Sequence, residues 1–352
     1  MARPRGSHRW LVKGESRLTI SVELSLPWPG DPVALVAILA EVLYPIPPIL
    51  LLAWRRPDTV ARVIEQLRSV KPELLFVACD GPDSDDPEAQ EACLQTRMVI
   101  EQGITWPCRV ERLYREQHLG CRRGVSEAIS WFFTHVEAGI ILEDDVLPHP
   151  SFFPFCAELL DRYRDDSRIG MVSGCTIRNL PTWDDSSYRF SRFFHVWGWA
   201  SWRRAWIHYD AEMTQWPRLR EQHWLKEFNG ERFARYWQYQ FDRVWRGECD
   251  TWDYIWMLSC WIQGQICILP SVNLVDNLGF EDPRATHTAR DQSPLPKASY
   301  LDFPLLHPNH RLIDGKIDAM DLGRYYAPPL QRRILRRLRR ELRRIRNVAM
   351  AL

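Results

Sequence analysis

From residue 45 onward, the chain alternates short apolar runs with longer amphipathic segments. The apolar parts of "PILLLAW" and "ELLFVACDGP" contain almost no polar position, which indicates strands buried on both faces. Between them, Val60, Val63, Ile64 and Leu67 recur at helical spacing, and Pro57 suits a first-turn position. A strand, a helix and a second buried strand in this order predict an α/β fold with a parallel sheet.

The same alternation continues along the chain. "RVERLYREQHLGC" is a third, partly alternating strand, residues 123–136 form a predicted helix, and "GIILEDD" is a fourth strand. "SFFPFCAELLDRYRDD" then predicts another helix, and "RIGMVSG" another buried strand. In such a sheet the functional loops lie at the carboxyl ends of the strands.

The pattern changes at Trp183, where the sequence becomes aromatic and rich in arginine. Of 17 tryptophans, 12 lie between Trp183 and Trp261. Few clean periods remain there, so we predict irregular loops and short helices packed on the sheet. These rings serve either as core packing or as stacking surfaces for a sugar. We predict an N-terminal extension over residues 1–44, one domain over 45–325, and a basic amphipathic helix over 326–352.

The C-terminal helix has an unusual charge pattern. Arginines cover most of its surface, and its apolar positions lie near one face: Leu330, Ile334, Leu338, Leu342 and Ile345. Such a helix can lie on an anionic membrane surface. A solvated helix docked on the protein is an equally good interpretation.

Composition narrows the class of protein. Lys and Arg total 46 against 45 Asp and Glu, so no overall field attracts nucleic acid. The nine cysteines are scattered without paired spacing, which argues against a disulfide framework or a zinc site and favours a cytoplasmic location. The apolar stretch over residues 31–54 is interrupted by Glu41 and three prolines, so a membrane-spanning helix is not expected.

Several common active-site motifs are missing. The first strand is followed by neither G-x-G-x-x-G nor a P-loop, and the chain has no G-x-S-x-G nucleophile elbow. Carboxylates at strand ends remain, above all Glu143, Asp144 and Asp145 in "ILEDDVLPHP". Alternation along a strand would turn Glu143 and Asp145 to one side and Asp144 to the other. This triplet predicts a metal and nucleotide site, and the alternative is a solvated acidic turn.

Seven segments carry a resemblance in this order: "AWRRPDTVARVIEQL", "LLFVACDGP", "HLGCRRGVSEAI", "ILEDDVLPHPSFF", "WGWASWRRAW", "TWDYIWMLSCW" and "NLVDNLGFEDPRATHT". Together they resemble nucleotide-diphospho-sugar glycosyltransferases of the GT-A fold, in a bacterial family-2-like group. More distantly they are similar to N-acetylglucosaminyltransferases with a Glu-Asp-Asp triplet. The resemblance covers residues 45–288 and implies a mixed, mainly parallel sheet flanked by helices, with an aromatic-rich acceptor region.

The resemblance also implies roles for single residues at a donor site. Asp145 would be the direct ligand of Mn²⁺ or Mg²⁺, with Asp144 near the ribose and Glu143 supporting. Asp80 would accept the uracil imide proton, although an ordinary Asp-Gly turn is the alternative. The rest of the implied nucleotide-sugar site is Ala53, Trp54 and Arg55 around the base, and Gly120, Cys121 and Arg122 beneath the sugar. The family more often has Asn where this chain has His118, so its role stays open.

Further roles concern chemistry and the acceptor. Asp253 matches the family's catalytic base, with Asp250 as the alternative, and Asp253 can instead cap a helix. His287 matches a histidine that completes the metal shell in many such enzymes. The remaining candidates are His195 and Trp199 for the acceptor, Arg203 and Arg204 for an acidic acceptor, and Arg284 and Arg290 for the diphosphate.

The sequence therefore predicts a metal-dependent hexosyl- or N-acetylhexosaminyltransferase that uses a nucleotide sugar, with uridine inferred from Asp80 alone. The predicted acceptor is a carbohydrate or glycolipid hydroxyl, transfer inverts the anomeric centre, and the enzyme is cytoplasmic or peripheral on the inner face of a membrane. One alternative is a sugar nucleotidyltransferase, but its glycine-rich, lysine-bearing loop is missing after "ILLLAW". The other is a non-catalytic glycan-binding protein on a transferase scaffold.

Overall fold

The computed structural model describes residues 8–13, 19–24, 44–83, 85–182, 184–285 and 295–326. The chain divides into two units, Met1–Leu43 and Tyr44–Leu352. In the first unit, β1 (His8–Lys13) and β2 (Thr19–Leu24) pair in antiparallel register. Of the predicted C-terminal helix, only Tyr326 lies within the described residues.

The second unit is built on an eight-stranded sheet in the order β5-β4-β3-β6-β10-β8-β11-β9. Six strands run in one direction, and β10 and β9 run against them. This arrangement confirms the predicted α/β class with a mixed, mainly parallel sheet flanked by helices. The strands are β3 (Ile49–Ala53), β4 (Leu74–Cys79), β5 (Arg109–Tyr114), β6 (Ala138–Glu143), β8 (Ile169–Ser173), β9 (Tyr188–Ser191), β10 (Trp199–Trp202) and β11 (Ile266–Pro270).

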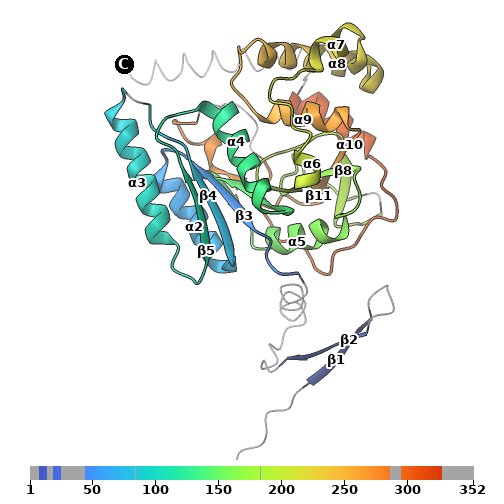
Figure 1. Cartoon of the computed structure of the whole chain (residues 1–352). Helices are drawn as coiled ribbons and strands as arrows, with labels where there is room; N and C mark the ends of the chain where they lie inside the picture. The colour runs from blue at the N-terminus through green and yellow to red at the C-terminus, as the bar shows by residue number, and fades with distance from the viewer. Residues whose placement is uncertain are drawn as a thin grey trace, which may run out of the picture. The chain divides into compact units, whose positions relative to one another are not determined.

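Helices cover both faces of the sheet (Figure 1). One apolar cluster joins Ile49 and Leu51 of β3 to α2 (Pro57–Val70), α3 (Pro87–Gly103) and α5 (Phe152–Arg162). The other joins Leu50 and Leu52 to α4 (Gly120–His135), α6 (Arg203–Trp206), α8 (Trp224–Trp245) and α9 (Asp253–Ile262). Because β3 alternates between two cores, all five of its residues are buried, as its continuous apolar sequence predicts.

Helix α3 was not predicted, and its composition explains why. Its buried residues are Ala89, Cys93, Thr96 and Ile100, so its inner face is mostly small or polar and gives little apolar periodicity. A local signal was nevertheless present: the Asp86 carboxylate accepts hydrogen bonds from two backbone N–H groups of the first turn, and a proline follows it.

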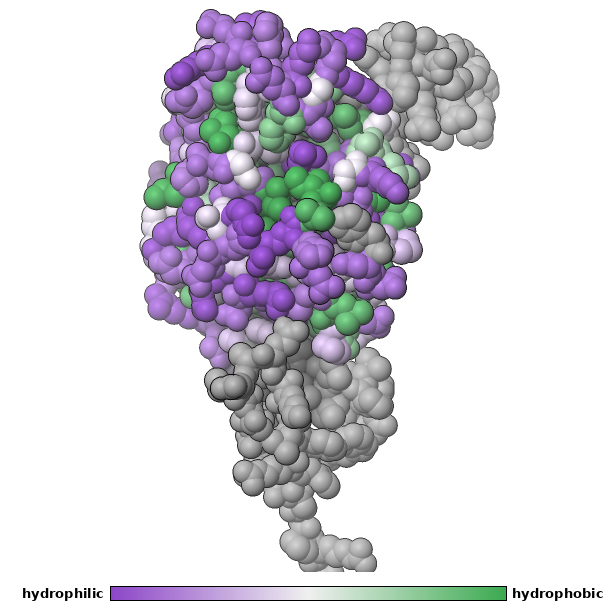
Figure 2. Space-filling view, turned by 90° about the vertical axis from the view of Figure 1, so that its right-hand side faces the viewer, coloured by the Kyte–Doolittle hydropathy of each residue, from purple (hydrophilic) through white to green (hydrophobic). Residues whose placement is uncertain are grey.

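The aromatic region is more regular than predicted. It supplies three strands of the sheet and the 22-residue α8, which is kinked where Asn229 and Gly230 leave helical backbone angles. It also contains α7 (Trp216–Glu221). Eight of its eleven described tryptophans are buried in the core, and five of these are fully buried, namely Trp199, Trp216, Trp237, Trp256 and Trp261. One outer face of the molecule is largely hydrophilic, with small apolar groups only (Figure 2).

A small second sheet supports the end of β6. Here β7 (Val146–Pro148) pairs antiparallel with β12 (Val275–Asn277), and the short helix η1 (Leu278–Phe280) follows. The Leu278 N–H donates to the Asp145 carbonyl at 2.8 Å, which fixes the turn after β6. The described chain ends with α10 (Gly315–Asp321) and a π-helical turn, η2 (Leu322–Tyr326). Among the described residues no helix is both long and apolar enough to cross a membrane.

Candidate functional site

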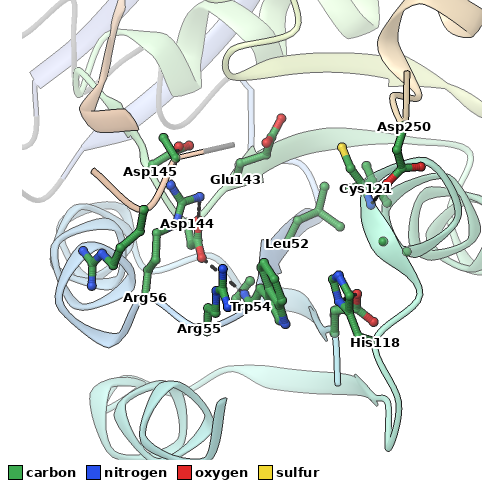
Figure 3. A pocket seen from close by; sticks show the side chains of 18 of the residues that line it. Leu52, Trp54, Arg55, Arg56, His118, Cys121, Glu143, Asp144, Asp145 and Asp250 are labelled. Atoms are coloured by element: carbon green, nitrogen blue, oxygen red, sulfur yellow. Dashed lines mark hydrogen bonds and ion pairs between the residues drawn. The ribbon is translucent and has the colours of Figure 1, made fainter. Parts of the chain in front are cut away.

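A cavity of about 430 Å³ opens at the carboxyl ends of β3, β4 and β6. This is the edge where open α/β sheets bind ligands, because the loops that follow parallel strands meet there. The structure brings most predicted donor-site residues together in its wall (Figure 3). They are Ala53, Trp54, Arg55, Asp80, Gly120, Cys121, Glu143, Asp144, Asp145 and Asp250.

The centre of the cavity is an ion-pair cluster that includes a residue the sequence analysis did not select. Arg56 donates to Asp145 Oδ2 at 2.8 Å and also to Asp144 Oδ1, so one guanidinium bridges both carboxylates. The second oxygen of Asp144 accepts the Trp54 N–H at 3.2 Å. β6 ends at Glu143 and the two aspartates lie in the turn beyond it, so the predicted alternation across the triplet is wrong.

Burial sets the protonation chemistry of this cluster. Burial, together with the Asp145 charge, raises the pKa of Glu143 to about 8. Burial also raises the pKa of Asp144, although the Arg56 charge opposes it. For Arg56, burial lowers the pKa but the two aspartates raise it more, so the guanidinium stays charged. Within this cluster, the Arg56 cation therefore stands among the three carboxyl groups of Glu143, Asp144 and Asp145.

Asp145 also has unused acceptor capacity. Its Oδ1 atom is buried and has no hydrogen-bond partner among the described residues. Oxygen ligands of this kind suit Mg²⁺ or Mn²⁺, which usually take one or two carboxylates and complete their shell with water and substrate phosphate. Within the described part of the chain, no three His, Cys, Asp or Glu side chains form a metal-binding cluster. The Asp145 carboxylate, with its unbonded Oδ1 atom, is a ligand of the kind that such an ion takes.

One side of the cavity is a stack of three side chains. The Trp54 and His118 rings lie 4.1 Å apart and 9° from parallel, and the Arg55 guanidinium lies 4.0 Å from the Trp54 ring centre. His118 Nδ1 is 2.8 Å from Asp80 Oδ2. Asp80 also accepts N–H groups of Gly81 and Leu119 at 3.0 to 3.2 Å. His118 thus belongs to the site, in contact with two predicted base-binding residues.

The opposite wall is formed by the start of α4. Asp250 accepts the N–H groups of Cys121 and Arg122 at 2.8 and 3.1 Å and so caps this helix. Gly120 has φ of +79°, and a Cβ atom there would lie 2.8 Å from Asp250 Oδ2. Arg122 turns away to the Ala211 carbonyl. The predicted alternative base is therefore in the wall but is already bound to a helix end.

Asp253 lies at the start of α9 and is not among the residues that line the cavity. Its carboxylate accepts the Thr251 hydroxyl. It is close enough for its charge to raise the pKa values of both Cys121 and Glu143, after the larger effect of burial. Asp253 thus lies behind the wall, within electrostatic range of two residues in it.

The predicted acceptor residues lie elsewhere. His195 and Trp199 are 4% and 0% exposed. The His195 ring contacts the Tyr326 hydroxyl, and Trp199 stacks on Trp252. Both belong to the aromatic core, so neither faces the cavity. Among the described tryptophans of the aromatic region, Trp197 lines the cavity.

The arginines proposed for ligands are committed to the protein. Arg204 donates to three backbone carbonyls, and Arg203 donates to the Phe133 carbonyl and Glu137. Arg284 lines the cavity, but it donates to Asp58 and Asp282, which ties the loop after η1 to the start of α2. His287 and Arg290 lie outside the described residues.

Two residues of the site were missed or left without a role, Arg56 and His118. Arg56 had a readable signal, because it stands at the N-cap of α2, where a cation opposes the helix dipole and cannot act as a capping acceptor. His118 had no such signal, since its stacking on Trp54 joins segments that lie far apart in the sequence.

Comparisons with known proteins give distant structural matches only. No family model matches the chain, and no curated protein matches it. A cytidylyltransferase from Leptospira borgpetersenii aligns at 12% identity and a TM-score of 0.31, over 47% of this chain and 63% of its own. A mannosyltransferase from Pyrobaculum calidifontis, in complex with GDP-Man and Mn²⁺, aligns at 15% identity and a TM-score of 0.29, over 48% of this chain and 51% of its own.

A third match is glucosyl-3-phosphoglycerate synthase from Mycobacterium tuberculosis, in complex with Mn²⁺, UDP and glucosyl-3-phosphoglycerate. It aligns at 16% identity and a TM-score of 0.24, over 42% of this chain and 49% of its own. The chain thus spans less than two thirds of each of these three structures. The function proposed for this chain therefore rests on the residues of its own cavity.

Proposed function

We propose that this protein is a metal-dependent glycosyltransferase that moves a sugar from a nucleotide diphosphate, a UDP-sugar, to a carbohydrate or glycolipid hydroxyl with inversion. One observation carries the proposal: carboxylates at the ends of β4 and β6 line the same cavity as a stacked aromatic group. Such a wall offers a face for a nucleobase and oxygen ligands for a cation that binds its diphosphate.

Trp54 and Asp80 are the proposed base-binding residues. Trp54 is fixed by its indole N–H, which donates to the Gly81 carbonyl at 2.8 Å, and its ring is covered by His118 and Arg55, so a base would stack on it in place of one of these side chains. The Asp80 carboxylate is already close to three donors, of which only His118 is a side chain. A uracil imide N–H would therefore take the place of the His118 ring, which moves by rotation of its side chain. His118 is in this way a gate for the base.

Asp145, assisted by Asp144, would hold Mn²⁺ or Mg²⁺ at the diphosphate. When bound, such an ion neutralises the negative charge that develops on the departing nucleotide diphosphate. Glu143 lies at the end of β6 beside them and helps to set the charge of the cluster. His287 is the proposed further ligand, and it lies outside the described residues.

The proton of the attacking hydroxyl would pass to a carboxylate at the start of α9 or in the loop between α8 and α9. Asp253 is the first candidate by resemblance, supported by the contribution of its charge to the raised pKa of Cys121, a residue of the wall. Asp250 is the alternative, supported by its position in the wall, although two backbone N–H groups already bind it. The carboxylate of either Asp253 or Asp250 can accept the proton as a general base.

The acceptor region is proposed around Trp197, whose ring packs edge-on against Phe280 at 5.3 Å and lines the cavity. His195 and Trp199 would act only by supporting this wall from the core. Peripheral binding to the inner face of a membrane through the arginine-rich segment 326–352 is a separate proposal about residues that are almost all outside the described ones.

Calorimetric titration of UDP and GDP, with Mn²⁺ and then with EDTA, tests the proposal. We expect Mn²⁺-dependent UDP binding that disappears in Asp145→Ala. Asp165→Ala is the matched control, because that side chain is 94% exposed and does not line the cavity. If no nucleotide binds to the wild-type protein under any condition, the proposal is wrong and a glycan-binding role becomes the better hypothesis.

Turnover assays then separate the chemistry. We expect free UDP and transferred or released sugar from a UDP-sugar, with loss of turnover in either Asp253→Asn or Asp250→Asn. Asparagine keeps an oxygen that can cap α4, so the Asp250 variant removes charge without removing the cap. Formation of a nucleotide sugar from a sugar phosphate and a nucleoside triphosphate, with pyrophosphate, would instead identify a nucleotidyltransferase.

A further inference from the structure

The guanidinium of Arg56 binds Asp144 and Asp145, the two carboxylates that the proposed function assigns as ligands of a divalent ion. It contacts Asp145 Oδ2 at 2.8 Å and Asp144 Oδ1 in the same fork. All three side chains are largely buried, at 17%, 3% and 9% exposed for Arg56, Asp144 and Asp145. Two buried carboxylates need a cation nearby, and in this structure the chain itself provides one.

Arg56 is held in this position by the aspartates rather than by its own helix. It is the N-cap residue of α2 and makes no side-chain cap, and the amino end of a helix repels positive charge. Both the positive end of the α2 dipole and burial disfavour a charged Arg56 at this position. The two carboxylates offset these costs. The Arg56 side chain therefore stays in this position only while Asp144 and Asp145 offer it their negative charge.

Asp145 offers a route for a second cation. Its Oδ1 atom is buried and has no hydrogen-bond partner among the described residues, so one oxygen of the carboxylate is available while the other binds Arg56. A divalent ion at this carboxylate would stand next to the guanidinium, and like charges a few Å apart in a partly dry site repel strongly. The two cations therefore compete.

We propose that Arg56 is a tethered counter-ion, which holds Asp144 and Asp145 in the free protein and is displaced when a divalent ion binds Asp145. The inference rests on the proposed function for the identity of the ion's partner, the donor diphosphate. A released guanidinium remains at the wall of the same cavity, because Arg56 lines it, and guanidinium pairs well with diphosphate oxygens. Arg56 thus exchanges one anionic partner for another.

Manganese titration without nucleotide, followed by the electron paramagnetic resonance signal of free Mn²⁺, tests this exchange. Arg56→Met removes the charge and keeps most of the side-chain length, and we expect it to bind Mn²⁺ at least tenfold more tightly than the wild-type protein. Arg56→Lys keeps a cation but cannot bridge two carboxylates, so we expect an intermediate affinity. Arg164→Met is the charge-matched control, since Arg164 is 67% exposed and does not line the cavity.

Thermal unfolding gives a second readout. Without metal, Arg56→Met should melt below the wild-type protein because it leaves two buried carboxylates without their cation. Mn²⁺ should then raise its melting temperature more than it raises that of the wild-type protein. If Arg56→Met does not fold, the Arg56→Lys comparison decides the question alone, because a cation remains at the site.

Equal Mn²⁺ affinities in the wild-type protein and both Arg56 variants would overturn the exchange. So would a wild-type protein that binds UDP in EDTA and binds no Mn²⁺ even with UDP, because Arg56 would then be a permanent substitute for the ion. Failure of the proposed function gives a different result: Mn²⁺ affinity responds to Arg56→Met as expected, yet no nucleotide binds with or without the metal.

Discussion

Replacing Glu143 with glutamine should change how the stability of the protein depends on pH. Burial and the Asp145 charge raise the pKa of Glu143 from 4.5 to about 8 in the folded protein. The folded state therefore keeps a proton that the unfolded chain releases between these two values. Because the folded state binds more protons across this window, the free energy of unfolding falls as pH rises from 4.5 and levels off above about pH 8.

The structure sets the size of this effect. Each unit of pKa difference corresponds to about 1.4 kcal/mol, so the full difference would amount to about 5 kcal/mol. The Glu143 side chain is half-buried and lines the cavity, where water relieves part of this cost. We therefore expect the free energy of unfolding of Glu143→Gln, relative to that of the wild-type protein, to rise by about 1 to 3 kcal/mol as the pH increases from 5 to 9.

Denaturant unfolding in EDTA, at several pH values between 5 and 9, measures this difference. The matched control is Glu73→Gln, because Glu73 is exposed just before β4 and lies outside the cavity. Other titrating groups contribute equally to each protein and cancel in the comparison. The reasoning is refuted if the stability difference between Glu143→Gln and the wild-type protein stays constant with pH, as it should for the control.

Three further outcomes follow from the geometry of the cavity. Gly120→Ala should lower stability by about 1 to 2 kcal/mol in thermal unfolding, because φ of +79° is unfavourable for alanine and its Cβ would meet the Asp250 carboxylate. Trp54→Ala should weaken UDP binding about tenfold in calorimetry through lost stacking, and Trp54→Phe should restore much of it. Trp199→Leu should lower the melting temperature through a cavity in the core and leave the KM for acceptor unchanged, and a selective rise in the KM for acceptor would instead support an acceptor-site role.

The central sheet and the donor-site wall could be predicted because their signals are local. Strands β3 and β4 are buried on both faces, so a continuous apolar run identifies each of them. Asp80 and Asp145 follow such runs directly, and the ends of parallel strands meet at one edge of the sheet. Strand direction predicts that these carboxylates meet at one edge, whereas the roles predicted for single residues came from the resemblance.

The aromatic region could not be predicted in the same way. Trp199 sits in a four-residue strand that runs against its neighbours β6 and β8, and both sides of that strand are buried. Its ring packs on Trp252 and Trp256, which come from the far end of the region. Sequence shows that many large rings are present, but which ring faces a ligand depends on how distant segments meet.

Arg56 shows where the limit of local reasoning lies at the site itself. Its sequence context, next to a helix-starting proline, is unfavourable for a cation, and that conflict is visible without a structure. What resolves the conflict is the pairing of β3 with β6, which brings the residues after each strand together across almost ninety positions of sequence. A residue that breaks a local rule is expected to be compensated by a distant partner, and such residues tend to be functional. Arg56 and the carboxylates of Asp144 and Asp145 therefore form one ion-pair cluster, and removing Arg56 should change how the carboxylates bind a cation.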